Sequence, residues 1–394
     1  MVSCLLCISC GLSEVGDAGS NAGGDVWGGP VGDAGGSSGG LESVCYMTAV
    51  DYPKGYDWRS DQACGSVRCS LVVYADKIPV MKVPVGQNYH TSSDVDMHRL
   101  SGYDLYTDYV SDTETVIRKN GQEIFRYEGA ERICGLIARG GDVFTLGESR
   151  QGEGFSFRKN GAVVLSRGKA HVAAPLRCDG DSLCFGFREQ IQAATGAIDR
   201  YYCVYGNKVV NLSLREDIKA VWDVFTSDGQ PVLLASLKGV EQPVMICGES
   251  LNALNVPKGM TMVSGSMFRV GAQIGVEGVC RTSSGSLRCG IWLGGSLLIL
   301  FDTPNIASVC TEGSGVSCVV NPSDAGASGK IYRCGELYTM PQGYVCMSAD
   351  CIDMVNGILH VGLSSFDGSR PLLWRDGLVD TLKINGFISG IKAL

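Results

Sequence analysis

The sequence predicts an all-β protein, a β-propeller built from four-stranded antiparallel blades, and three observations support this. Near copies of one hairpin occur forty residues apart, as Arg118–Phe125 (RKNGQEIF) and Arg158–Leu165 (RKNGAVVL). Asn-Gly between two apolar runs is the strongest short-range signal for a hairpin. The chain has 54 Gly and only 12 Pro, with 45% apolar and 19% charged residues, which fits many short strands joined by tight turns.

The third observation is the spacing of the turns. Successive turn residues lie 40 to 47 residues apart, and this period suits a four-stranded propeller blade. The eight turn residues are Lys77, Gly121, Gly161, Asn207, Gly248, Gly295, Gly335 and Gly377. A second series of turn glycines precedes most of these by 19 or 20 residues, at Gly102, Gly141, Gly180, Gly229, Gly271, Gly315 and Gly357. Two series at one offset indicate a repeated unit.

Each unit then divides into four strands, A to D. The clearest unit has A at 133–139, B at 142–147, C at 154–159 and D at 162–167; another has its strands at 221–226, 232–237, 243–247 and 251–256. These runs are rich in Val, Ile, Leu and aromatic residues, as strands buried on both faces require.

The number of D-strand turns predicts eight blades, with seven as the alternative. The first blade takes B from 44–50, C from 68–74 and D from 78–83, and has no A strand of its own. Residues 388–394 follow the last D-strand turn at the distance expected of an A strand. We therefore expect the C-terminal strand to join the first blade, which protects the strand edges.

The N-terminal part, residues 1–42, is expected to lie outside the propeller domain of residues 43–394. Residues 11–41 are rich in Gly, Ser, Asp and Ala, which predicts a flexible tether. The segment Ile8-Ser9-Cys10 and this acidic stretch resemble the start of a bacterial lipoprotein, with a truncated signal sequence. The resemblance implies lipidation of Cys10; the alternative is a tail whose cysteines have no role.

The repeats also resemble a known group. Segments such as Trp374-Arg375-Asp376-Gly377 and Tyr332-Arg333-Cys334-Gly335 are similar to the degenerate propeller repeats of Bacteroidetes surface lipoproteins, over residues 43–394. The chain lacks the Trp-Asp signature of WD40 blades and, as a recurring feature, the paired glycines of kelch blades. The resemblance implies fold and location, because most members of such families have no assigned activity.

Eighteen cysteines stand in the chain, and most are expected to be small buried residues. Two pairs lie symmetrically about predicted A-to-B turns, Cys178 with Cys184 and Cys310 with Cys318, and are candidate disulfides. The Cys-x-x-Cys spacings of residues 4–10 have no second pair to complete a zinc site. No metal or other cofactor is expected.

Three long B-to-C loops are predicted, at residues 51–67, 188–198 and 281–286, all on one face of the propeller. Loops on one face of a rigid scaffold commonly carry binding groups. The candidate ligand-binding residues are Tyr52, Tyr56, Asp57, Trp58, Arg59, Asp61, Arg188, Glu189 and Arg281. Aromatic faces interleaved with charge suit a carbohydrate or a protein partner; the alternative is a loop that only packs over the propeller.

Three aromatic residues occupy equivalent C-strand positions, Trp292, Tyr332 and Trp374. They could form a ring of sugar-stacking side chains, but a repeated position is also what packing between blades produces. We favour packing.

The charge and hydropathy of the chain exclude some functions. A net charge of −8 and a pI near 5.1 argue against nucleic acid as a partner, because phosphate binding needs clustered Lys and Arg. The chain contains no run of about 18 apolar residues that could form a membrane-spanning helix. Membrane association is therefore expected only through a lipid at Cys10.

The sequence thus favours a non-enzymatic binding or scaffold propeller on a bacterial cell envelope, anchored in the outer membrane or periplasmic. No catalytic motif is found. The alternative is a carbohydrate-active enzyme, a glycoside hydrolase or lyase, because a propeller can place carboxylates around a funnel without any local motif.

Overall fold

The computed structural model describes residues 45–56, 69–85, 93–98, 102–110, 113–150, 154–179, 182–193, 196–212, 217–227, 229–324, 326–365 and 370–393. Every regular element in these residues is a β-strand. No helix in this part of the chain is long and apolar enough to cross a membrane. The described residues fall into two compact units, one within residues 1–90 and 344–394, the other within residues 91–343.

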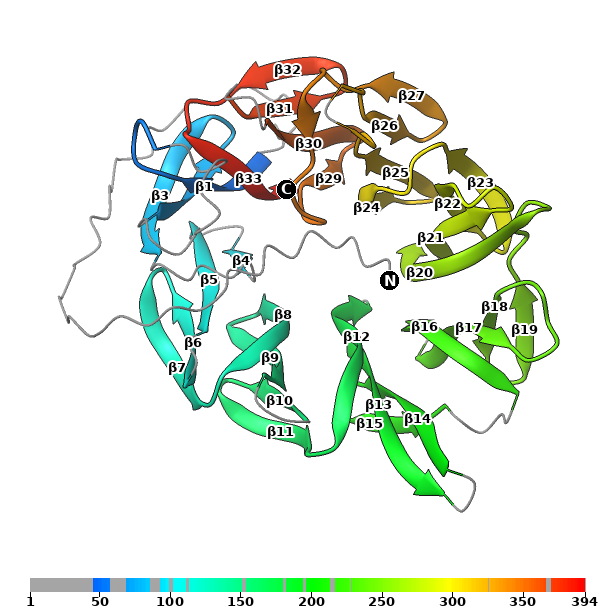
Figure 1. The fold of residues 1–394 in the computed structure, drawn as a ribbon. Coiled ribbons are helices and arrows are strands. Elements are labelled where there is room, and N and C mark those ends of the chain that lie inside the picture. The colour runs from blue at the N-terminus through cyan, green and yellow to red at the C-terminus, as the bar shows by residue number, and fades with distance from the viewer. Residues whose placement is uncertain are drawn as a thin grey trace. The chain divides into compact units, whose positions relative to one another are not determined.

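The unit of residues 91–343 consists of six four-stranded antiparallel sheets that follow one another along the chain (Figure 1). The first three sheets contain β4 (Ser93–His98), β5 (Gly102–Val110), β6 (Glu114–Lys119) and β7 (Gln122–Glu128); β8 (Glu131–Arg139), β9 (Asp142–Ser149), β10 (Phe155–Lys159) and β11 (Ala162–Arg167); β12 (Ala170–Asp179), β13 (Ser182–Ala193), β14 (Gly196–Tyr205) and β15 (Lys208–Asn211).

The remaining three sheets of this unit have the same order. They contain β16 (Ile218–Ser227), β17 (Gln230–Leu237), β18 (Val244–Cys247) and β19 (Ser250–Ala253); β20 (Met260–Val270), β21 (Gln273–Thr282), β22 (Leu287–Leu293) and β23 (Ser296–Phe301); β24 (Ile306–Glu312), β25 (Gly315–Val320), β26 (Lys330–Arg333) and β27 (Glu336–Thr339). In each sheet the hydrogen-bonded order is the chain order, which is the meander of a propeller blade.

The unit of residues 1–90 and 344–394 holds two more sheets. One sheet has the order β3-β2-β1-β33 and contains β1 (Cys45–Asp51), β2 (Cys69–Ala75), β3 (Ile78–Val85) and β33 (Gly386–Ala393). The other contains β28 (Tyr344–Val345), β29 (Ile352–Val355), β30 (Ile358–Ser365), β31 (Leu372–Arg375) and β32 (Leu378–Thr381), and both β28 and β29 pair with β30.

The predicted fold class is confirmed: the chain is an all-β, eight-bladed β-propeller rather than a seven-bladed one. The predicted closure is confirmed as well. β33 pairs antiparallel with β1, so that Met47 lies opposite Ile391 and Ala49 opposite Ile388. Ile388 is fully buried, and its Cγ2 occupies the space that a side chain at Gly362 of β30 would need. The C-terminal strand therefore fills the seam between the first and last blades.

The repeated Asn-Gly turns have the geometry that the sequence predicts. Asn120 and Gly121 have φ of 50° and 82°, and Asn160 and Gly161 have φ of 49° and 78°. The asparagine does more than tolerate a positive φ. Asn160 Oδ1 accepts a 2.8 Å bond from the Val143 N–H and its Nδ2 donates to Asp142, while Asn120 binds Leu105 and Asp104 in the same way. Each turn is thus tied to the strand beside it.

Neighbouring blades of the larger unit pack through apolar side chains. Phe155 and Phe157 of β10 meet Phe185 and Phe187 of β13, with ring centroids 5.0 to 5.8 Å apart. All four rings are buried, and burying one such side chain stabilises a fold by about 1.5 to 3 kcal/mol. The large apolar residues of the repeat therefore hold one blade against the next.

The strand pairing at the two predicted disulfides differs by one residue from the predicted pairing, so the cysteines of each pair do not lie opposite one another. Asp179 pairs with Ser182 and Glu312 pairs with Gly315, so each A-to-B turn is one residue shorter than a symmetric arrangement of the cysteines requires. Cys178 consequently lies opposite Leu183 and Cys310 opposite Ser317, and all four cysteines are thiols. A slip of one residue places paired positions on opposite faces of a sheet.

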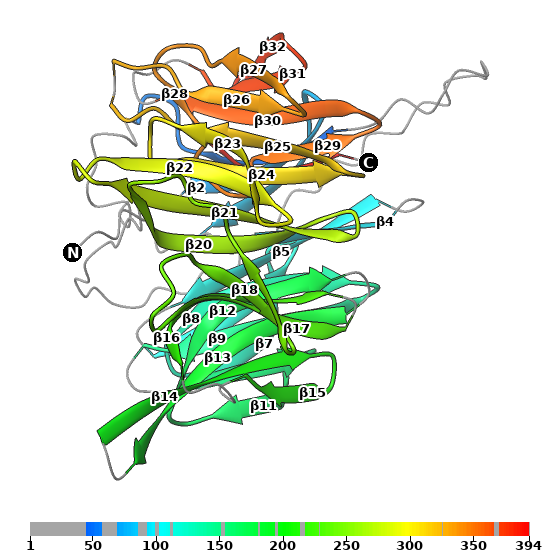
Figure 2. The same cartoon turned by 90° about the vertical axis from the view of Figure 1, so that its right-hand side faces the viewer.

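The second predicted long loop is mostly strand, and the third is shortened to residues 283–286. Residues 188–193 belong to β13 and residues 196–198 to β14, so the second loop is an extension of a hairpin whose Arg188 lies opposite Tyr201. This hairpin reaches well past its short neighbour β15 (Figure 2). Arg281 and Thr282 belong to β21. Alternating polar and apolar residues, Gln190 to Ala193, continue β13 beyond the point where the sequence predicts that it ends.

The three equivalent aromatic residues serve packing, as favoured above. Trp292, Tyr332 and Trp374 are 0%, 6% and 4% exposed. Trp292 also donates a 3.1 Å hydrogen bond from its indole nitrogen to the Asn255 carbonyl. Their ring faces are not available to a sugar.

Candidate functional site

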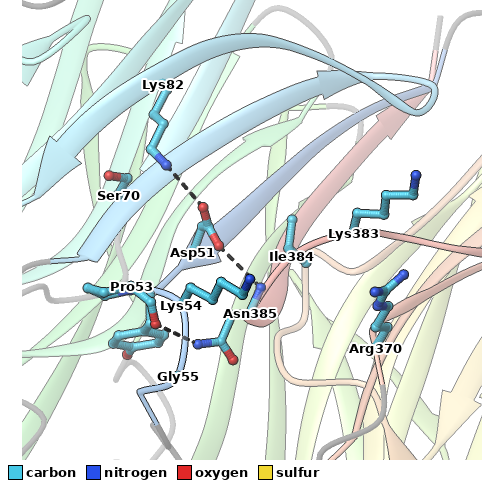
Figure 3. A pocket seen from close by; sticks show the side chains of 11 residues that line it. Asp51, Pro53, Lys54, Gly55, Ser70, Lys82, Arg370, Lys383, Ile384 and Asn385 are labelled. Atoms are coloured by element: carbon cyan, nitrogen blue, oxygen red, sulfur yellow. Dashed lines mark hydrogen bonds and ion pairs between the residues drawn. The ribbon is translucent and has the colours of Figure 1, made fainter.

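A pocket of about 600 Å³ lies in the smaller unit, where the loop after β1 meets the chain that enters β33 (Figure 3). We call it the seam pocket. It is on the face of the B-to-C loops, the face expected to carry binding groups. Its described lining residues are Asp51, Tyr52, Pro53, Lys54, Gly55, Ser70, Lys82, Arg370, Lys383, Ile384 and Asn385.

Asn385 shapes the floor of the seam pocket. Its side-chain Nδ2 donates to the carbonyls of Pro53 and Tyr56 at 2.8 and 2.9 Å. Its backbone carbonyl accepts a 2.9 Å bond from the Tyr52 N–H. One side chain thus satisfies two carbonyls of a turn. The loop after β1 is held against the start of β33 by these bonds.

Positive charge dominates the seam pocket. Lys54, Lys82, Arg370 and Lys383 line it, against the single carboxylate of Asp51. Lys82 Nζ lies 3.1 Å from Asp51 Oδ2, and Asp51 Oδ1 accepts a 3.2 Å bond from the Asn385 N–H (Figure 3). Both carboxylate oxygens are therefore engaged, and the pocket has an excess of three positive charges in a protein whose net charge is −8.

The other three cations are available to a ligand. Lys54, Arg370 and Lys383 are exposed, and none of them has a carboxylate at ion-pair distance among the described residues. Their charged groups come from three chain segments: the loop after β1, the residue preceding β31 by two positions, and the approach to β33. Cations that converge from separate segments can surround an anionic group.

A tyrosine pair lies beside the seam pocket. The rings of Tyr52 and Tyr56 are 5.4 Å apart at an angle of 37°, and both residues are half-buried. Tyrosine presents an apolar face together with a polar tip, which suits contact with a sugar ring. The structure thus brings Tyr52 and Tyr56, two predicted ligand-binding residues, to the seam pocket.

The other predicted residues do not join it. Asp57, Trp58, Arg59, Asp61 and the lipidation residue Cys10 lie outside the described residues. Arg188 and Glu189 belong to the other unit, where Arg188 lies 3.2 Å from Asp199 and Glu189 lies 3.4 Å from Arg167. Arg281 lies exposed near the end of β21, and it lines neither of the two pockets described here.

A second pocket of about 420 Å³ contains Arg188 and is lined further by Arg132, Glu148, His171, Val172, Ala173, Tyr201 and Val221. Its one carboxylate is already engaged. Glu148 forms an ion pair with Arg132, accepts a 3.2 Å bond from the Val172 N–H and lies 3.1 Å from His171 Nδ1. These contacts join the second and third sheets of the unit, so we assign Glu148 a structural role.

Among the described residues, neither pocket has the carboxyl pair of a glycosidase. Glycoside hydrolysis needs a pair of carboxyl groups about 5 to 10 Å apart, and the described lining of each pocket contains a single carboxylate with its oxygens engaged. The excess of positive charge in the seam pocket suits an anionic ligand.

No protein-family model matches the chain, and no curated protein matches its sequence. Similar solved structures include BBS1N in complex with ARL6DN (9% identity, TM-score 0.37, covering 71% of this chain and 88% of that one). An Aleuria aurantia lectin in complex with α-methyl-L-fucoside has 10% identity and a TM-score of 0.32, over 65% of this chain and 96% of the lectin.

An acylaminoacyl peptidase is also similar in structure, with 11% identity and a TM-score of 0.42 over 78% of this chain and 53% of the peptidase. This chain spans about half the length of that enzyme. At such low identities and TM-scores, none of these structures bears on ligand or activity.

Proposed function

We propose that this chain is a non-enzymatic binding propeller, displayed on a bacterial cell envelope, that binds an acidic carbohydrate in the seam pocket. The single observation that carries the proposal is the convergence of Lys54, Arg370 and Lys383 around one pocket, with the Asp51 carboxylate already engaged. Charge-assisted hydrogen bonds to a carboxylate or sulfate are about twice as strong as neutral ones.

The size and surroundings of the pocket support a sugar rather than a protein as the occupant. A volume of about 600 Å³ falls within the range of small-molecule sites. The Tyr52 and Tyr56 rings beside the pocket offer apolar faces for the C–H side of a sugar ring. A protein partner would instead need a wide apolar centre.

The test compares oligogalacturonates with neutral oligosaccharides of the same length by isothermal titration calorimetry. We expect binding of the acidic series only, with affinity that falls as salt is raised. Lys383→Gln and Arg370→Gln should each weaken binding by about 10-fold or more, since a hydrogen bond to a charged group contributes about 1.5 to 3 kcal/mol. Lys258→Gln, an exposed lysine outside the pocket, is the matched control.

Equal binding of acidic and neutral sugars, or no effect of the pocket variants, would refute the proposal. Tight binding of an acidic peptide with the same dependence on Lys383 and Arg370 would assign the pocket to a protein partner. Cleavage of any oligosaccharide by the full chain would favour the enzyme instead.

Display on the envelope rests on the resemblance of Ile8-Ser9-Cys10 to a lipoprotein start and on the Gly/Ser/Asp-rich residues that follow. The cysteine thiol would carry the lipid and the following stretch would act as a spacer. Expression in a bacterium fed a clickable fatty acid should label the full chain, and Cys10→Ser should abolish the label. An unlabelled full chain would end this part of the proposal.

A further inference from the structure

The innermost position of the last blade is interrupted by a short excursion of the chain. β28 ends at Val345 and β29 begins at Ile352, and both strands pair with β30. Residues 346–351 (Cys-Met-Ser-Ala-Asp-Cys) leave the sheet and return to it. We call this segment the excursion. A cysteine stands at each of its ends.

The two cysteines of the excursion are held close together by one shared acceptor. Cys346 Sγ donates to the Ser348 carbonyl at 3.3 Å, and the Cys351 N–H donates to the same carbonyl at 3.2 Å. The Cys346 side chain is also a direct neighbour of the Cys351 thiol. Both cysteines are buried, at 3% and 0% exposure. A turn of this kind holds the sulfur atoms together without a covalent bond.

The excursion also supports the closing strand. Cys351 Sγ donates to the Ile388 carbonyl at 3.3 Å, and the Asp350 backbone carbonyl accepts a 2.6 Å bond from the Ile391 N–H. Ile388 and Ile391 are among the β33 residues that pair with β1 in the first blade. The excursion is therefore packed against the strand that completes the propeller.

We propose that Cys346 and Cys351 form an intramolecular disulfide under oxidising conditions, and that this disulfide fixes the excursion against β33. Their contact contrasts with the pairs 178/184 and 310/318, whose members lie on opposite faces of their hairpins. The proposal does not depend on the ligand of the seam pocket.

The reaction is a thiol–disulfide exchange with an external disulfide such as oxidised glutathione. The thiolate of one cysteine attacks a sulfur of the oxidant, breaks its S–S bond and releases one glutathione thiol. The second protein thiolate then attacks the mixed disulfide, forms the Cys346–Cys351 bond and releases the second glutathione. Two electrons pass to the oxidant, and the two protons of the protein thiols end on the two glutathione molecules.

The surroundings of Cys346 and Cys351 determine when the disulfide can form. The neighbouring Cys346 side chain, together with burial, raises the pKa of Cys351 well above its ordinary value. Only the thiolate reacts, so exchange proceeds when the excursion opens or while the chain folds. Oxidation of the folded protein is expected to be slow, and oxidation during refolding fast.

The test is to refold the full chain in a glutathione redox buffer, block remaining thiols with an alkylating reagent and map disulfides by peptide mass spectrometry. We expect a peptide linked through Cys346 and Cys351 and lighter by two hydrogens than the reduced form. Closing a loop of this length should raise the Tm by about 3 °C relative to the reduced chain. The rise should be lost on adding a thiol reductant.

Cys351→Ala and Cys346→Ala should remove this Tm response, while Cys178→Ala and Cys310→Ala, the matched controls, should keep it. Mapping of the wild-type chain decides the matter even if a variant fails to fold. Absence of the 346–351 link in oxidised wild-type protein, or a Tm response that survives in Cys351→Ala, would overturn the proposal. A link that leaves the Tm unchanged would overturn the role in fixing β33.

Discussion

The Asn385 side chain donates a 2.9 Å hydrogen bond to the Tyr56 carbonyl, across 329 residues of chain. A second bond from the same amide group reaches the Pro53 carbonyl at 2.8 Å. The approach to the last strand therefore determines the shape of a loop near the start of the described chain, and the seam pocket depends on this contact.

Asn385→Ala should loosen the seam pocket. Two carbonyls of the loop lose their partner, and we expect a loss of about 1 to 3 kcal/mol in the free energy of unfolding, together with weaker binding of acidic oligosaccharides. Urea denaturation and calorimetry measure the two effects. Asn305→Ala, which removes a 3.4 Å bond to the Pro322 carbonyl in the other unit, should lower stability without changing ligand affinity. Unchanged affinity in Asn385→Ala would contradict the assigned role.

The repeat could be recognised from sequence because its turn chemistry is local. A positive φ at Asn160 and Gly161 restricts the residues allowed there, and the bond from the Val143 N–H to the asparagine side chain explains the preference for Asn over Gly at the first position. In the same way the Cys45 N–H donates to Asp76 Oδ1 and the Leu359 N–H donates to Asp376 Oδ1. Each blade carries its own signal, so blades could be counted.

Register and the site were harder to predict. Whether an A-to-B turn holds two residues or three cannot be seen from the spacing of Cys310 and Cys318, yet it decides which face each side chain occupies. Lys54, Arg370, Lys383 and Asn385 were missed because they are ordinary polar residues in separate segments. The predicted closure could have located these residues, because a C-terminal strand in the first blade places residues 383–385 beside the loop after β1.

A buried ion pair joins the start of β8 to β10. Arg158 forms two hydrogen bonds of 2.7 Å to Glu131, and its guanidinium lies 4.0 Å from the Tyr127 ring centroid. Glu131→Gln should lower the free energy of unfolding by about 3 to 5 kcal/mol, because it leaves a buried charge without its counter-ion. Replacing both residues, Glu131→Leu with Arg158→Met, should restore much of that loss in urea denaturation. A double variant as unstable as the single one would contradict this reasoning.

Glu277 should make the protein less stable as the pH rises toward neutrality. Burial raises the pKa of this carboxyl to about 7, with Asp223 adding to the rise and Arg177 opposing it. The folded state therefore retains a proton that the unfolded chain releases near pH 4.5. The free energy of unfolding should fall between about pH 4.5 and 7 by on the order of 3 kcal/mol and then level off.

Glu277→Gln tests this through chemical denaturation at a series of pH values. The variant should lose this decline and gain stability relative to the wild type above pH 7. Glu249→Gln, at an exposed glutamate, should retain the wild-type profile. Identical profiles for the wild type and Glu277→Gln would show that the carboxyl ionises as freely as in water.

His360 should have the opposite effect from Glu277: it should make the protein less stable as the pH falls. This imidazole is 2% exposed, and neither ring nitrogen has a hydrogen-bond partner in the described structure. Burial and the charge of Arg375 lower its pKa, against the weaker influence of Asp376 and Asp76. The unfolded chain therefore binds a proton first, and stability should fall as the pH drops below about 6.5.

His360→Leu should flatten the acid decline and raise stability, because an unsatisfied buried polar group is replaced by an apolar one. Thermal unfolding between pH 5 and 8 measures this, with His171→Gln, at a half-buried histidine on another blade, as the control. If His360→Leu loses stability below pH 6.5 as the wild type does, groups other than His360 cause that loss.

Thermal unfolding of two truncated chains tests most directly whether the C-terminal strand completes the fold. Removal of residues 388–394 deletes most of β33, exposes the backbone edge of β1 and uncovers the face of neighbouring β30 on which Gly362 and Ser364 contact Ile388. We predict a global loss of stability, with aggregation through the bared edge. Removal of residues 1–41 should leave the Tm unchanged. A chain lacking residues 388–394 that melts like the full-length protein would contradict the account.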